Sequence, residues 1–261
     1  GVAGGVAGEA AREAAGKGPG VGRAEGRGAG CFVAVGGVYL DEIHELERFP
    51  VEDSAIRSQT IRHQRGGNAA NSAVVLAQLQ VGTGIPVEWL GVVAKRDQPD
   101  VAFVLAALST AGVGTSLAEV VLGERVQLPK AIILSPRDSG SRTIISSRRG
   151  MRELSVSHFI SALPKLAYRA PWLHFECREP QSVSKMVAAA AGGRAQNAAG
   201  DGAGGGWMTI SAEVEKPQLP ISQLAGLLSE CDIVFFSREF IERNADALLP
   251  TNRSITQSTT Q

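Results

Sequence analysis

Glycines and asparagines gather in one short stretch that could contact a small molecule, residues 65–72 (RGGNAANS). Glycine lets a backbone approach a ligand closely or adopt a positive φ angle. Asn68 would cap the helix that the next residues (AVVLAQL) predict. Asn71, three residues later, would lie on the same helix face. Asparagine both donates and accepts hydrogen bonds, so the stretch is interpreted as a helix start and as a wall suited to sugar hydroxyls.

A carboxylate precedes this stretch in a position suited to the same ligand. Residues 31–40 (CFVAVGGVYL) form an apolar run typical of a buried strand, and Asp41 follows it directly. In an open parallel sheet, ligands gather beyond the carboxyl ends of the strands. Asp41 is therefore a candidate ligand contact, with the alternative that it is an ordinary cap or turn residue.

Strand-like and helix-like segments alternate along most of the chain. Further apolar strands are expected at 87–93, 171–176, 207–215 and 231–237, and helices at 71–79, 100–113, 155–166, 181–190 and 221–230. This alternation predicts an α/β fold with a mostly parallel central sheet and helices on both faces. Half-exposed strands within about 42–64 do not fit that layer, and we expect them to project from it as a flap.

Low-complexity segments border and interrupt the predicted domain. Gly or Ala fills 19 of the first 30 positions, which predicts disorder over residues 1–30. A degraded transit peptide is a second interpretation, although three glutamates argue against it. Residues 188–206 (AAAAGGRAQNAAGDGAGGG) predict a long surface loop, and the polar residues 250–261 a tail. The folded domain is therefore expected over residues 31–249.

Composition argues against several classes of partner. The chain has 26 Lys and Arg against 26 Asp and Glu, so no net field attracts nucleic acid or an acidic membrane surface. Arginines recur between residues 137 and 152, but Asp138 and Glu153 interrupt them, which favours a solvated loop over a polyanion patch. No apolar run approaches membrane-spanning length. Three cysteines without regular spacing indicate a reducing, cytoplasmic compartment rather than a disulfide framework.

A metal site has little support in the sequence. His174 and Glu176 would share one face of a strand, but no second pair of ligands follows at the spacing that zinc requires. We therefore expect no protein-held metal.

Several separated motifs resemble one family of enzymes. GGNAANSAVVLAQL (66–79) resembles the first signature of the PfkB/ribokinase family of carbohydrate kinases. Residues 38–72 are similar to the ketohexokinase branch of that family, the ATP-dependent fructokinases of animals. So are GSRTIISS (140–147), WLHFECRE (172–179), SAEVEKP (211–217) and DIVFFSRE (232–239). The resemblance implies a ribokinase-like three-layer sandwich with a projecting β-clasp lid, its strands at about 42–64 and 116–147.

The resemblance also implies roles for particular residues. On the sugar side these are Asp41, Gly67, Asn68, Asn71 and Arg142. On the nucleotide side the candidates are Arg178, Lys216 and Arg238, which could meet phosphate charge or be ordinary surface cations. ATP and Mg²⁺ are implied as cofactors, and fructose or a similar ketose as the acceptor at its 1-hydroxyl. Adenosine and ribose are alternative acceptors. A homodimer through the β-clasp is implied as well.

The chain departs from the family pattern in its catalytic motifs. SREF (237–240) stands in place of the family's Asn-x-x-Glu motif, which is linked to metal and phosphate. The family's late Gly-Ala-Gly-Asp turn, which supplies the catalytic base and an anion hole, has no counterpart; DGAGGGW (201–207) lacks the aspartate after its glycines. We therefore assign no catalytic residue and expect a chain truncated at its C-terminus, with little or no turnover. A non-catalytic sugar-binding or dimerisation module is the alternative.

Overall fold

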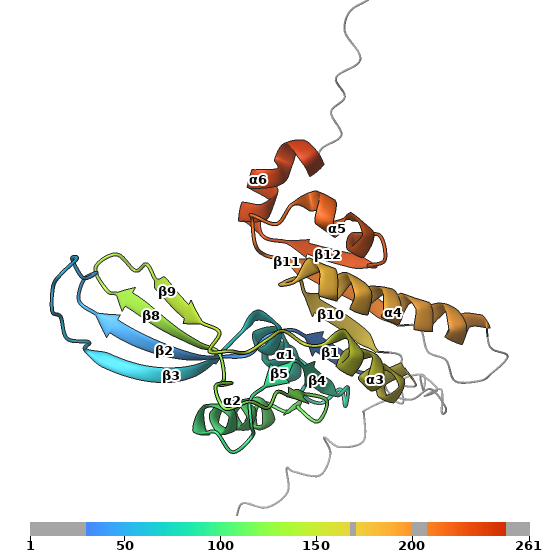
Figure 1. Ribbon diagram of the computed structural model, residues 1–261, viewed down its shortest axis with the longest axis horizontal. Helices are drawn as coiled ribbons and strands as arrows, with labels where there is room; N and C mark the ends of the chain where they lie inside the picture. The colour runs from blue at the N-terminus through green and yellow to red at the C-terminus, as the bar shows by residue number, and fades with distance from the viewer. Residues whose placement is uncertain (1–29, 168–170, 200–207, 249–261) are drawn as a thin grey trace, which may run out of the picture.

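A six-stranded sheet with helices on both faces forms the main body of the protein, and a four-stranded sheet projects from it (Figure 1). The computed structural model describes residues 30–167, 171–199 and 208–248. The segment 1–29 and the tail 250–261 lie outside these described residues, so the expectations for them are untested. The α/β fold with a mostly parallel central sheet is confirmed.

The central sheet is parallel throughout. Its strands are β1 (Phe32–Val35), β4 (Val87–Leu90), β6 (Val113–Gly114), β10 (Trp172–Glu176), β11 (Thr209–Val214) and β12 (Ile233–Phe236). They lie in the order β12-β11-β10-β1-β4-β6. Parallel strands carry helices on both faces and therefore appear in sequence as almost continuous apolar runs. This is why the apolar runs at β1, β10 and β11 located three neighbouring strands.

The helices cover the two faces of this sheet. They are α1 (Asn68–Leu79), α2 (Pro99–Thr110), α3 (Val156–Ala167), α4 (Pro180–Ala199), α5 (Ile221–Leu228) and α6 (Arg238–Leu248). Successive residues of a strand point to opposite faces. On β10, His174 faces the α1 side, whereas Phe175 packs against Phe159 of α3 with ring centroids 5.5 Å apart. No helix in the described ranges is long and apolar enough to cross a membrane.

Helix α4 corrects the expectation of a surface loop at 188–206. The helix continues through the alanine-rich stretch to Ala199, past Gly192 and Gly193. Alanine is the strongest helix former, and its summed propensity outweighs the cost of two glycines. Residues 200–206 lie outside the described part of the chain.

The projecting sheet, here called the lid, contains β2 (Tyr39–Leu46), β3 (Thr60–Gly66), β8 (Lys130–Pro136) and β9 (Thr143–Ser147) in the order β3-β2-β8-β9. Two boundaries differ from the expectation. The expected strand 31–40 is two strands, because the chain leaves the central sheet at Gly36 and enters the lid at Tyr39. Of the expected lid segment 116–147, Glu119–Val120 forms β7, which pairs with β5 (Val92–Val93) instead.

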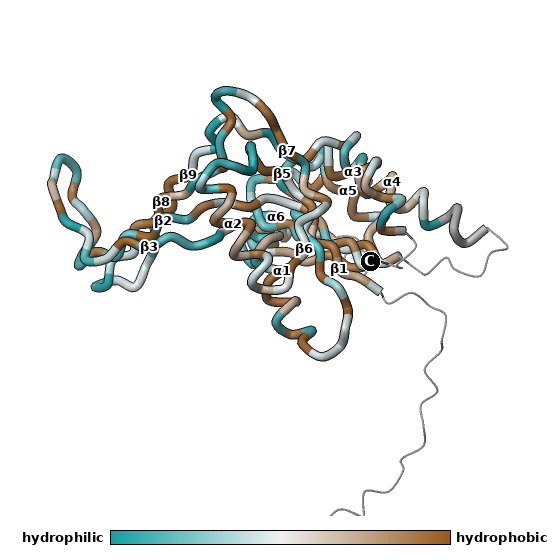
Figure 2. Tube along the Cα trace, turned by 90° about the horizontal axis from the view of Figure 1, so that it is seen from below, coloured by the Kyte–Doolittle hydropathy of each residue, from teal (hydrophilic) through white to brown (hydrophobic). Residues whose placement is uncertain are grey.

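Apolar residues occur on the lid as well as in the central body, and hydrophobic and hydrophilic segments alternate along its strands (Figure 2). Residues paired across strands share a face. Ile132 pairs with Glu42 and with Ile145, so one face carries these two isoleucines. Ile61 pairs with His44 on the same face. All three isoleucines are exposed, and we call this the isoleucine face.

The same face holds a cluster of charged and titratable groups around Glu42. Its carboxylate lies 2.6 Å from Lys130 Nζ, 2.9 Å from His44 Nε2 and 3.3 Å from His63 Nε2. The hydrogen bonds from Lys130 and His44 lower the pKa of Glu42 to about 2. The cluster joins three of the four lid strands through one ionised carboxylate.

Replacing Glu42 by glutamine tests this linkage. A folded-state pKa of about 2 against a usual value of 4.5 gives stability that is complete above pH 4.5 and is lost as the pH falls through 2. We expect Glu42→Gln to lower the free energy of unfolding at pH 7 by about 1 kcal/mol, because the site is partly exposed. Urea unfolding at pH 7 and pH 3 measures the difference from wild type, which should shrink at pH 3.

The exposed Glu47, which follows β2, provides the control. Glu47→Gln should change unfolding by less than about 0.5 kcal/mol at either pH. A Glu42→Gln effect of equal size at pH 3 and pH 7 would show that the carboxylate charge does not stabilise the lid.

Candidate functional site

Glycines bring the lid and the start of α1 into contact with the central sheet. Gly67 is the N-cap residue of α1 and has a φ angle of 98°. A Cβ atom there would lie 2.4 Å from the carbonyl oxygen of Gly37, and one on Gly66 would lie 2.3 Å from Asp41 Oδ2. Both distances are far below van der Waals contact. The two glycines therefore let the carboxylate of Asp41 and the backbone after β1 lie directly against the segment that begins α1.

Asp41 lies inside β2, not beyond the end of β1 as expected, because β1 already ends at Val35. Burial raises the pKa of the Asp41 carboxyl, while the nearby guanidinium groups of Arg65 and Arg142 act in the opposite direction. Arg142 lies just before β9 of the lid, and its expected contact with a sugar stays a prediction. Arg65 was missed as a site residue, although it stands inside the RGGNAANS motif.

The two asparagines differ in their contacts. Asn68 does not cap α1 as expected, because Gly67 occupies the N-cap position and no side-chain cap bond forms. Its amide nitrogen instead donates to Glu213 Oε1 at 3.1 Å and to Glu215 Oε2 at 2.8 Å. Asn71, one turn later and exposed, accepts a hydrogen bond from Arg65 Nη1 at 2.5 Å. The sequence motif gave no sign of the two glutamates, which lie about 145 residues further along the chain.

Arg178, Lys216 and Arg238 each follow the carboxyl end of a central strand, two residues after β10, β11 and β12 respectively. They lie at the edge where ligands bind in open parallel sheets. Arg238 is 85% exposed and forms an ion pair with Glu242 at 2.6 Å. Lys216 is half-buried. The expected contact of these two cations with phosphate stays a prediction.

The guanidinium of Arg178 is engaged inside the protein. It lies 3.1 Å from Glu176 Oε1 and 3.3 Å from Glu153 Oε1, and donates to the Tyr39 hydroxyl at 2.5 Å. Burial raises the pKa of Glu176, which also accepts the Gly37 N–H at 2.9 Å, while Arg178 acts in the opposite direction. This network ties the end of β10 to the first residue of the lid. The guanidinium of Arg178 thus has internal partners at the base of the lid, and its expected nucleotide contact stays a prediction.

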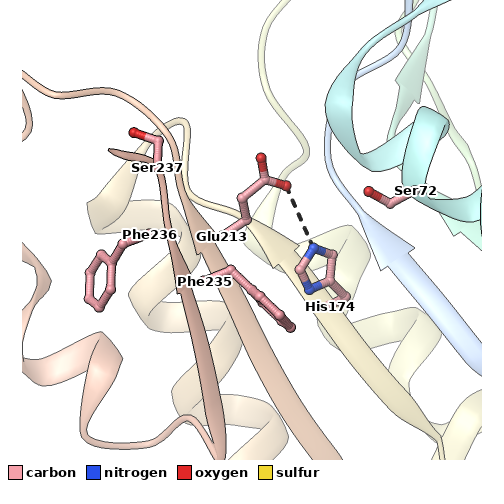
Figure 3. Close-up of a pocket in the computed structure, with 6 residues that line it drawn as sticks. All are labelled: Ser72, His174, Glu213, Phe235, Phe236 and Ser237. Carbon is pink, nitrogen blue, oxygen red and sulfur yellow. Dashed lines mark ion pairs between the residues drawn. The ribbon is translucent and has the colours of Figure 1, made fainter. Parts of the chain in front are cut away.

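A cleft of roughly 360 Å³ opens on the α1 side of the sheet (Figure 3). It is lined by Ser72, His174, Glu213, Phe235, Phe236 and Ser237. The Nε2 atom of His174 lies 3.7 Å from Glu213 Oε2, and its Nδ1 atom bonds Ser211 Oγ at 2.8 Å. Glu213 thus contacts both the cleft and Asn68. The volume of the cleft is in the range of small-molecule sites.

Candidate metal ligands are scattered over the described residues. No group of three or more His, Cys, Asp or Glu side chains in the described ranges could hold an ion. Mg²⁺ is usually held by one or two carboxylates together with substrate phosphates, so a magnesium-dependent reaction does not require such a group.

The fold and the site place the chain in a family of known proteins. The family model "pfkB family carbohydrate kinase" matches residues 32–259, so the chain belongs to the pfkB family of carbohydrate kinases. Among curated proteins, ketohexokinase of Mus musculus is 29% identical over 207 residues, which are 79% of this chain and 63% of that protein.

Solved structures show the same fold. Ribokinase from Giardia lamblia superposes with a TM-score of 0.63 at 19% identity, over 82% of this chain and 59% of that one. A fructokinase with bound ATP from Xylella fastidiosa gives 0.55 at 22% identity, over 85% and 65%. Ribokinase from Arabidopsis thaliana, complexed with ribose and ATP, gives 0.60 at 18% identity, over 82% and 62%. The chain thus spans less than two thirds of the length of each of these relatives.

Substitution of Gly67 tests the close crossing on which the site depends. Gly67→Ala adds the strain of a positive φ angle, about 1–2 kcal/mol, to a clash with Gly37 that costs about 1–3 kcal/mol more. Gly82 provides a matched control, because its φ angle is 88° but nothing lies within 4 Å of an added Cβ. Urea unfolding should show a clearly larger loss for Gly67→Ala, or no folded protein, while Gly82→Ala stays folded. Equal losses of unfolding free energy in the two variants would mean that the backbone at Gly67 and Gly37 moves apart at little cost.

Proposed function

We propose that this chain carries the acceptor side of a carbohydrate kinase site of ketohexokinase type. The acceptor is fructose or a similar ketose, phosphorylated at its 1-hydroxyl, and the donor is ATP. One observation carries the proposal: Arg65 of β3 donates to Asn71 of α1, and Asp41 of β2 lies against Gly66, the residue next to Arg65. The similarity to mouse ketohexokinase supports the choice of a ketose over ribose or adenosine.

The chemistry of these side chains suits a sugar. A carboxylate accepts hydrogen bonds from hydroxyl groups, a guanidinium donates them, and an asparagine amide does both. Asn68 completes the set one turn before Asn71, and Gly67 offers backbone that a ligand can approach. The lid would cover the bound sugar, which excludes water from the reacting hydroxyl.

Lys216 and Arg238 are the proposed contacts for the phosphates of ATP. Both follow central strands at the carboxyl edge, on the side of the cleft that includes Ser237. Phosphoryl transfer depends mainly on positioning and on neutralising charge, which cations at this edge would provide. ATP would bring Mg²⁺ with it. The fructokinase of Xylella fastidiosa was solved with ATP bound, which supports this choice of donor.

A non-catalytic sugar-binding module is the second candidate. The observation that favours it is that SREF (237–240) stands in place of the family's Asn-x-x-Glu motif, which is linked to metal and phosphate, whereas the residues of the sugar side are kept. Binding would then occur without phosphorylation by this chain.

Calorimetric titration of the whole chain with D-fructose tests the sugar site. We expect Asp41→Asn to weaken binding at least about tenfold, since a hydrogen bond to a charged group is worth about 1.5–3 kcal/mol. Asp97→Asn, which alters an exposed carboxylate paired with Lys95, is the matched control and should bind as wild type does. D-ribose and adenosine are titrated in parallel to test acceptor choice.

Formation of ADP from MgATP in the same buffer separates the two candidates. Fructose-dependent ADP formation supports the kinase, and binding without it supports the module. The absence of heat with every sugar would contradict both.

The lid is also the proposed surface for self-association. Ile61, Ile132 and Ile145 are exposed by 58%, 40% and 57%, and the isoleucine face on which they lie is on the opposite side of β2 from Asp41. Ile132 and Ile145 are paired neighbours, and exposed apolar patches often mark interaction sites. A second copy of the chain could cover them by pairing lid to lid.

Sedimentation velocity tests this dimer. We expect the wild-type chain to sediment as a dimer and Ile145→Lys to shift it to the monomer, because a buried unpaired charge at an interface is costly. Val81→Lys, at an 83% exposed position after α1, should leave the dimer intact. A monomeric wild-type chain at micromolar concentration would refute lid-mediated association.

A further inference from the structure

Asn68 and Asn71 lie one turn apart on α1, and a neighbour engages one end of each amide. An asparagine amide has an oxygen that only accepts hydrogen bonds and a nitrogen that only donates them. Which end a ligand meets therefore depends on which end the protein already uses. The neighbour of Asn71 is Arg65 of β3. The neighbours of Asn68 are Glu213 of β11 and Glu215, which follows that strand.

The carbonyl end of Asn71 is the end in use. It accepts from Arg65 Nη1 at 2.5 Å. A guanidinium has five donors and no acceptor, so only the amide oxygen can face it. The NH₂ group of Asn71 has no partner among the described residues and is left to a ligand or to water.

Asn68 has the opposite arrangement. Its nitrogen donates to Glu213 Oε1 and Glu215 Oε2, at 3.1 Å and 2.8 Å. Ionised carboxylates only accept, so only the NH₂ end can face them. Its two N–H groups match the two carboxylates, and within the described ranges the carbonyl oxygen of Asn68 has no partner.

We propose that Arg65, Glu213 and Glu215 are positioning residues that set the hydrogen-bond polarity of the sugar site. Asn71 then offers donors and Asn68 an acceptor, beside the acceptor oxygens of Asp41. The matching ligand class is a polyol with neighbouring hydroxyls, because a hydroxyl donates and accepts at once, whereas a carboxylate or a ketone only accepts. This inference rests on the proposed function, since it concerns the same site.

The first test needs no sugar. In the ¹⁵N-labelled full chain, side-chain amide signals are assigned from their loss in Asn68→Asp and Asn71→Asp variants, and their exchange with water is measured. We expect the NH₂ protons of Asn68 to exchange about tenfold more slowly than those of Asn71, because two carboxylates hold them. In Glu213→Gln/Glu215→Gln this protection should fall. Slower exchange at Asn71, or protection unchanged in the double variant, overturns the proposal.

The second test uses fructose analogues in which fluorine replaces one hydroxyl, at C3 or at C4. Fluorine accepts weakly and cannot donate. Wild type should bind at least one analogue about tenfold more weakly than fructose, since donation to Asn68 is lost. Glu213→Gln/Glu215→Gln should reduce that difference in affinity. A glutamine can also donate a hydrogen bond, so the side-chain amide of Asn68 can then flip and present its nitrogen to the ligand. A difference that persists in the double variant contradicts the proposal.

Arg65 gives an independent pair of variants on another element. Arg65→Lys still only donates and should keep the wild-type ratio between fructose and its analogues, whereas Arg65→Gln, which can also accept, should change it. Equal ratios in both variants contradict the role of Arg65. If wild type gives no heat with fructose, the proposed function fails, and the exchange order of Asn68 and Asn71 still decides the orientation of the two amides.

Discussion

The structure depends on one close backbone crossing, where the segment that begins α1 passes over the segment that joins β1 to the lid. Gly67 and Gly37 are the residues in contact, and a side chain on Gly67 would lie 2.4 Å from a carbonyl oxygen. Without this approach, α1 could not start against the central sheet while β3 stays paired with β2. The lid, the helix that carries the two asparagines and the strand that carries Asp41 meet here. A single steric constraint therefore fixes how the lid and the central sheet share a site.

Charge complements this steric constraint at the base of the lid. Glu176, at the end of β10, accepts the Gly37 N–H and pairs with Arg178, whose guanidinium lies 5.0 Å from the centre of the Tyr39 ring. Tyr39 is the first residue of β2, so the central sheet holds the lid strand at its origin. Each charge in this network has a partner, as buried charges require. The position of Arg178 after a strand was evident in the sequence, but spacing along a strand does not show which internal carboxylates lie beside it.

The sequence pattern predicted the strands and helices that depend mainly on interactions between residues close together in the chain. Apolar runs located β1, β10 and β11, and the RGGNAANS motif predicted a helix close to the observed start of α1. Sheet order and the boundary between β1 and the lid did not follow from the sequence, because a continuous apolar run from 31 to 40 hides the exit at Gly36. The low composition complexity of residues 188–206 predicts a loop, but the run of alanines continues helix α4 to Ala199. In each failure, a long-range or summed effect decided between local alternatives.

At the candidate site, too, the sequence predicts the local structure but not the contacts between residues far apart in the chain. The spacing of Asn68 and Asn71 predicts that both lie on one helix face, but their sequence is silent on which amide end is available to a ligand. Tertiary contacts decide that, through a donor-only arginine from β3 and two acceptor-only glutamates after a strand some 145 residues away. Two identical side chains thereby acquire opposite hydrogen-bonding roles. The ligand preference of the motif is then a property of its neighbours, so the same RGGNAANS residues beside a different pair of partners would favour a different ligand.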